Sequence, residues 1–172
     1  MNILSQLGEV IPTDITADVY VDEVAHVKQL LHGKSRQELL SLPMMSETRK
    51  LVSPFKPCKR YAHGIHGPHD FSYALLSILF LQAAMQFMNL VLLTGLVVKP
   101  LLNPIIVLRM VKMSIEYGIC NISAFAFACY GAWLVSEPSC DVEGGHRMGR
   151  VATEMMTRLG AVVEVCSNDL VL

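Results

Sequence analysis

The chain has 172 residues, a formal net charge of −1 and 52% hydrophobic residues. This length suffices for one domain with its own core, and the balanced charge offers no basic field to a nucleic acid. Five cysteines without a CxxC pair argue against a disulfide framework or a zinc ribbon. The N-terminus lacks the basic and apolar regions of a signal peptide. We therefore expect a cytoplasmic protein in a reducing compartment.

The N-terminal segment, residues 1–50, is predicted to be helical. Apolar residues recur at helical spacing over Thr16–His32. Gly33 suits the left-handed position that often ends a helix. Ser35 and Glu38 then form the S-x-x-E pattern of a capping box, which predicts the start of a short second helix.

Residues 51–82 are expected to be an insert or loop with an apolar stretch. Leu51–Asp70 contains several prolines and glycines and shows no periodicity, which is typical of a loop. His63, His66 and His69 form an H-x-x-H-x-x-H motif of candidate metal ligands. Three-residue spacing in such a loop fixes no tetrahedral geometry, so a merely compositional His-rich tract is favoured. We expect neither a metal nor a cofactor.

The uncharged run Phe71–Val98 is longer than the roughly 20 apolar residues that span a bilayer. Within it, Gln82, Gln86 and Asn89 stand at i, i+4 and i+7, which indicates one face of an amphipathic helix. We therefore expect a composite, in which the apolar end of the insert meets a packing helix near Gln82.

Three further helices are predicted in a helical-repeat segment, residues 83–165. Leu102–Tyr117 has prolines near its start and a glycine after its end. Ala124–Val135 is apolar all round and should be buried. Arg147–Leu159 has the clearest separation of an apolar from a charged face.

The apolar helix is expected to pack closely on a neighbour. Ala124, Ala128 and Gly131 stand at i, i+4 and i+7 and would leave room for another helix, and Asn121 or Ser123 would provide the cap. With the helix that follows, it has about the length of one tetratricopeptide repeat, roughly 34 residues.

No residue pattern predicts catalysis. Cys129 lies on an apolar helix, where a cysteine is usually a small core residue. Asp141, Glu143 and His146 surround two glycines before a helix, and acidic groups there favour the helix N-terminus. General acid–base chemistry needs a positioned partner, and none is evident. We therefore expect no enzyme.

A set of strings, taken in order, resembles a known family: LGEVIPTDI, VKQLLHGKSRQELLSLPMMSE, AAMQFMNLV, NPIIVLRMVKMSIEYGICNISAFAFACYG and GHRMGRVATEMMTRL. They are similar to the helical region that follows the nucleotide-binding module of large STAND-class ATPases in two-component signalling. Such proteins typically combine a Ser/Thr-kinase-like domain, an AAA-type ATPase module, tetratricopeptide-like helices and, often, GAF and histidine-kinase domains.

The chain departs from this pattern in two informative ways. It contains no G-x-x-x-x-G-K-[ST] loop that could hold a nucleotide's phosphates. In the family, the counterparts of LPMMSE and AAMQFMNLV nearly adjoin, whereas residues 51–82 separate them here. We interpret these residues as translated non-coding sequence or a lineage-specific insertion, and residues 166–172 as a tail.

The sequence thus predicts an all-α fold of antiparallel helix pairs, and the resemblance implies a tetratricopeptide-like right-handed stack that is incomplete at its C-terminus. It also implies a non-catalytic scaffold or regulatory fragment of a signalling ATPase. Its partners would be proteins or the missing domains of a larger chain, not nucleic acid. The alternative is a small integral membrane protein, located in the membrane, with a span at about 71–98.

Overall fold

The computed structural model describes residues 17–45, 70–98, 102–137 and 140–160. An isolated parallel bridge between Met44 and Ile119 is the one strand-like pairing within these ranges. All other regular structure there is helical, which confirms the predicted all-α class. The helices are α2 (Ala17–Leu31), α3 (Arg36–Leu40), α4 (Asp70–Val98), α5 (Asn103–Tyr117), α6 (Ser123–Ser136) and α7 (Val142–Leu159).

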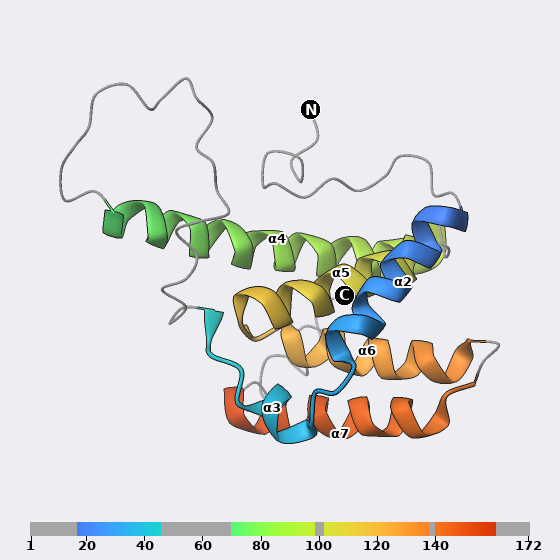
Figure 1. Cartoon of the computed structure of the whole chain (residues 1–172). Coiled ribbons are helices and arrows are strands. Elements are labelled where there is room, and N and C mark those ends of the chain that lie inside the picture. Colours follow the sequence, from blue (N-terminus) through green and yellow to red (C-terminus); the bar gives the residue numbers. More distant parts are fainter. Residues whose placement is uncertain (1–16, 46–69, 99–101, 138–139, 161–172) are drawn as a thin grey trace, which may run out of the picture.

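The last four helices pack in chain order. Figure 1 shows α4 across the top of the molecule, α5 beneath it, and α6 and α7 below, with each helix contacting the next. The N-terminal helices lie across this series, because α2 packs on α5 and α3 packs on α7. A stack of tetratricopeptide type remains a prediction.

The core is rich in methionine. The thioether chain is unbranched and flexible, so it fills irregular gaps between helices that cross at different angles. Phe127 of α6 and Leu39 of α3 are also fully buried. The methionines exposed by 1% or less are Met45, Met85, Met88, Met110, Met113, Met148 and Met155.

The predicted helix ends at Gly33 and Gly118 and the predicted capping box are confirmed. Gly33, after α2, has φ +76°, and Gly118, after α5, has φ +101°. Ser35 and Glu38 form the capping box of α3. The Glu38 N–H donates to Ser35 Oγ at 3.2 Å, and the Ser35 N–H donates to Glu38 Oε2 at 2.6 Å.

The predicted start of the last helix was wrong, because α7 begins at Val142 and includes both glycines. Asp141 caps it, with its Oδ1 accepting from the Gly144 N–H at 2.8 Å. Gly145 is needed where α6 and α7 cross. A Cβ on Gly145 would lie 2.8 Å from the carbonyl oxygen of Gly131. A Cβ on Gly131 would likewise lie 2.8 Å from the carbonyl oxygen of Gly145. Gly131 and Gly145 thus allow the backbones of α6 and α7 to approach closely. Gly145 does not mark a loop, as the sequence had suggested.

The expected details of α6 are corrected in two places. Ala128 is exposed, so the face that packs on α7 includes Gly131 but not Ala128. Neither predicted cap operates, because Ile122 occupies the N-cap. The hydroxyl of Ser123 instead accepts from the Cys120 N–H at 3.0 Å and lies 2.8 Å from the hydroxyl of Ser114. These buried groups join the end of α5 to the start of α6.

The α4 helix continues without a break through Gln82, so the predicted junction is not marked by a helix end. Leu81, on the N-terminal side of that position, is 6% exposed and belongs to the core. The apolar end of the proposed insert therefore contributes to the same packed helix. Residues 46–69 and 161–172 lie outside the described residues.

Candidate functional site

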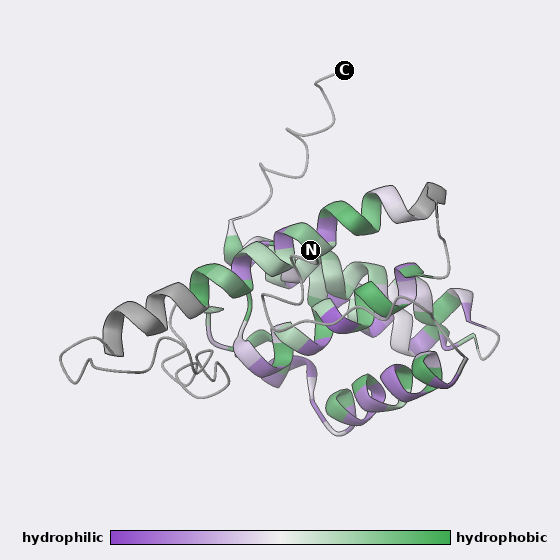
Figure 2. Ribbon diagram, turned by 90° about the horizontal axis from the view of Figure 1, so that it is seen from above, coloured by the Kyte–Doolittle hydropathy of each residue, from purple (hydrophilic) through white to green (hydrophobic). Residues whose placement is uncertain are grey.

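One face of α4 is apolar and uncovered. Leu79, Leu90 and Leu93 are exposed by 52%, 61% and 52%. They fall on one stripe with Ala83 and Gln86, which are also exposed, at steps of four and three residues. We call these five residues the outer face of α4. Figure 2 shows this helix crossing the molecule, with hydrophobic residues over much of its coloured length.

The opposite face of α4 packs against α5. Met85 and Met88 are fully buried and Leu92 is 4% exposed. Ile78–Gly95 is the one helical window in the described residues that is long and apolar enough to cross a membrane, and 33% of it is buried. Only one side of this apolar helix is therefore covered by the described fold.

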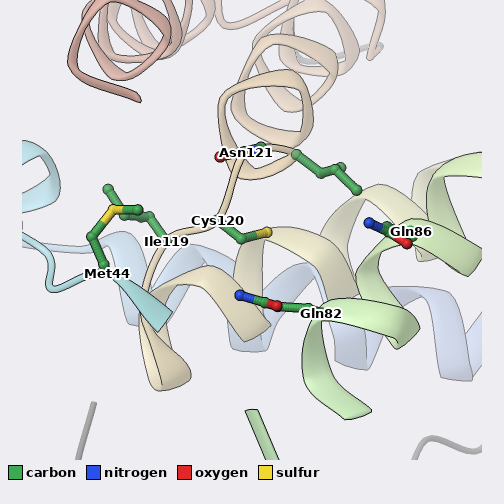
Figure 3. Close-up of a pocket in the computed structure, with 7 residues that line it drawn as sticks. Met44, Gln82, Gln86, Ile119, Cys120 and Asn121 are labelled. Carbon is green, nitrogen blue, oxygen red and sulfur yellow. The ribbon is translucent and has the colours of Figure 1, made fainter. Parts of the chain in front are cut away.

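A small cavity lies beside the outer face. Its volume is about 130 Å³, and its walls are Gln82 and Gln86 of α4, Met44, and the loop Ile119–Ile122. Figure 3 shows the two glutamine side chains on the side of the cavity opposite Asn121. Amide groups and a buried cysteine thiol give hydrogen-bonding walls but no acid–base pair. The cavity suits ordered water, which polar walls of this size can hold.

An aromatic row ties α2 to α6. The rings of Tyr20 and Trp133 meet edge to face at 6.5 Å between centroids, and those of Trp133 and Tyr130 stack at 5.5 Å. The Tyr20 hydroxyl donates to the Glu137 carboxylate. Burial, and then this hydrogen bond, raise the pKa of Tyr20 to about 12. The Tyr20 hydroxyl therefore stays protonated at neutral pH and remains a donor to Glu137.

An ion pair joins α2 to α5. Arg109 Nη2 lies 3.0 Å from Glu23 Oε1, and the two side chains are only 13% and 16% exposed. By helical spacing, Glu23 stands away from the apolar residues of α2 and would be expected to face solvent. It is instead held between two helices, which sequence periodicity alone does not reveal.

A second cavity, of about 270 Å³, opens between α2, α6 and α7. Its polar walls are Lys28 from α2, His32 just after that helix, Tyr130 from α6, and Asp141 and Arg147 at the start of α7. Leu31, Leu134 and Met148 form apolar walls. No sequence pattern predicted this site, because its groups come from segments that are far apart in the chain.

The candidate metal ligands His63, His66 and His69 lie outside the described residues, so that interpretation stays untested. In the part of the chain that the structure describes, no three His, Cys, Asp or Glu side chains lie close enough to hold a metal ion.

The candidate catalytic residues do not form a reactive site. Cys129 is half-buried, and burial raises the pKa of its thiol, which disfavours the nucleophilic thiolate. Asp141 serves as the cap of α7, and Glu143 and His146 are exposed on that helix. Asp141 and Glu143 stand at the N-terminus of α7, where acidic groups were predicted to be favourable.

Comparisons with known proteins give no relative. No protein-family model, curated protein or solved structure matches the chain. The proposals below therefore rest on the fold, its surfaces and the resemblance described for the sequence.

Proposed function

We propose that the chain is a non-catalytic helical scaffold or regulatory fragment of a STAND-type signalling ATPase. It would contact protein partners or the other domains of a larger chain. The observation that supports this proposal best is the uncovered outer face of α4. Contiguous exposed apolar surface on a folded protein usually marks a place where another molecule packs.

The pattern of this face fits a helical partner. Its residues recur at alternating steps of four and three, the spacing with which one helix packs along another. Gln86 stands in the middle of the stripe and is exposed. A partner helix can offer this amide a hydrogen bond, whereas the hydrocarbon of a bilayer cannot. This contrast favours a protein partner and a cytoplasmic location.

The competing proposal is a membrane span at about 71–98. The observation in its favour is that Ile78–Gly95 is long and apolar enough to cross a bilayer while two thirds of it is not buried.

Alkaline carbonate extraction separates the two proposals. Membranes from cells that express the full chain are washed at high pH, with a known integral membrane protein as a positive control. The scaffold proposal expects the chain in the supernatant, because a peripheral contact is released when charges and contacts are disrupted. Retention of the chain with the integral control in the pellet would show that α4 spans the bilayer.

The link to a signalling ATPase is tested by the genomic sequence on both sides of the coding segment. We expect an in-frame phosphate-binding loop upstream and a kinase core downstream, because the resemblance covers only the helical region between them. In-frame stop codons on both sides, confirmed in the mature transcript, would contradict this part of the proposal.

A further inference from the structure

The cavity between α2, α6 and α7 gathers positive charge from two helices. Lys28 and His32 lie one turn apart near the end of α2, and Arg147 lies on the second turn of α7. Among the described residues of the wall, Asp141 is the one acidic residue, and its carboxylate accepts the N–H of Gly144. Lys28, His32 and Arg147 thus outnumber the one carboxylate on the described walls.

One hydroxyl in the same wall is available to a ligand. Tyr130 is 2% exposed and lines the cavity, and its hydroxyl makes no hydrogen bond with any described residue. Burial raises the pKa of Tyr130 to about 12, so the hydroxyl remains a donor at neutral pH. Because no described residue accepts from it, this hydroxyl can donate to a ligand oxygen in the cavity.

We propose that this cavity binds a small phosphate monoester. Arg147, Lys28 and His32 contact the phosphate, and the Tyr130 hydroxyl donates to one of its oxygens. A doubly charged phosphate is favoured over a carboxylate because several basic groups converge, and arginine matches phosphate geometry with two parallel donors. The organic group of the ester lies against Leu31, Leu134 and Met148.

The volume supports a free small molecule as the ligand. About 270 Å³ is near the lower end of small-molecule sites, so it accommodates a phosphate and one compact organic group. This proposal does not depend on the scaffold function, because α4 contributes none of the residues that line the cavity.

The stacked pair next to the cavity provides the assay. Trp133 is the only tryptophan of the chain and stacks on Tyr130, so its fluorescence reports on the site. Phenyl phosphate and inorganic phosphate are titrated into the full chain, with calorimetry as a second readout. We expect a saturable fluorescence change and binding heat for phenyl phosphate, and weaker binding for inorganic phosphate.

Three variants test the named contacts. Tyr130→Phe keeps the ring and removes the donor, and we expect it to raise the Kd for phenyl phosphate about tenfold. Arg147→Gln should raise the Kd by at least as much and decides the question if Tyr130→Phe is unfolded by circular dichroism. Arg150→Gln is the control, because Arg150 is exposed on the same helix and does not line the cavity.

Two outcomes would overturn the proposal. One is the absence of saturable binding of either phosphate probe up to about 10 mM, a concentration that would detect even very weak sites. The other is a Kd that changes equally in Arg147→Gln and Arg150→Gln, which would indicate a nonspecific effect of charge. Benzoate binding as tightly as phenyl phosphate would contradict the assignment to phosphate.

Discussion

Gly131 of α6 and Gly145 of α7 set how closely these two helices approach. A methyl group on Gly131 would meet the backbone carbonyl of Gly145, which cannot move without shifting α7. We expect Gly131→Ala to lower the free energy of unfolding by about 1–2 kcal/mol, because overpacking outweighs the gain in helix propensity. Urea denaturation monitored by circular dichroism measures this change.

Gly149 is the matched control on α7. A methyl group there meets no atom within 4 Å. Gly149→Ala should therefore stabilise the protein by up to about 1 kcal/mol through helix propensity alone. Equal effects of the two substitutions would refute the close crossing of α6 and α7.

Two ion pairs of the fold should differ in their contribution because their burial differs. The Glu23–Arg109 side chains are 13–16% exposed, whereas those of Arg36–Glu154 are 37–43% exposed. Glu23→Gln should lower the free energy of unfolding by about 2 kcal/mol, since it leaves a partly buried cation without its carboxylate. Glu154→Gln should cost less than about 1 kcal/mol. Chemical denaturation of both variants in the same buffer compares the two losses in free energy of unfolding. A larger loss for Glu154→Gln than for Glu23→Gln would contradict this prediction.

At the scale of elements, α3 depends on its capping box. The backbone N–H of Ser35 bonds to the Glu38 carboxylate and lowers the pKa of that group from its ordinary 4.5. A lowered folded-state pKa contributes stability that is present above pH 4.5 and is lost as the pH falls through the lowered value. We expect the stability of Glu38→Gln to lack the pH dependence that the Glu38 carboxylate contributes.

Unfolding of wild type and Glu38→Gln by urea at several pH values from about 3 to 7 checks this expectation. The difference in free energy of unfolding between them should shrink below pH 4.5. A constant difference over the whole range would mean that the Glu38 carboxylate is not bonded in the folded protein.

Local signals in the sequence predicted the bounds of the helices better than they predicted which helices pack against each other. The expected Thr16–His32 and Leu102–Tyr117 agree with α2 and α5 to within one residue, because glycines with positive φ end both helices. The start of α7 was missed because two adjacent glycines are normally a loop signal. Only the neighbouring helix α6 reveals why they lie inside a helix.

The candidate site was predicted in part. The polar stripe at Gln82, Gln86 and Asn89 predicted a packing helix, but it did not predict that Leu90 and Leu93 would be exposed beside Gln86. Likewise, Glu154 and Arg158 stand four residues apart on one helix, yet Glu154 pairs with Arg36 of α3. The Arg158 guanidinium instead donates to the backbone carbonyl oxygens of Leu40 and Leu42. Such contacts depend on which helices meet, and sequence spacing does not contain that information.

At the scale of the whole molecule, the outer face of α4 should be dispensable for folding. Leu90 and Leu93 are more than half exposed. We expect Leu90→Gln with Leu93→Gln to change the free energy of unfolding by less than about 0.5 kcal/mol, as for other surface substitutions. The same variant should bind less of the dye ANS and should associate less in sedimentation velocity.

Met88, on the inner side of the same helix, is the control. Met88→Ala should lower the free energy of unfolding by about 2–5 kcal/mol, because the side chain is fully buried and its removal leaves a cavity. A large loss of stability in the double glutamine variant would mean that the outer face is part of the core.

The contact between α3 and α7 has a consequence for synthesis on the ribosome. Arg36 and Glu154 are 118 residues apart in the chain. At a usual elongation rate, α3 would leave the ribosome roughly ten seconds before its partner helix exists. Leu39, which is fully buried in the finished fold, is uncovered throughout this interval. The N-terminal helices are therefore the part of the nascent chain most in need of a chaperone, while the adjacent pair α6 and α7 can form as soon as both have emerged.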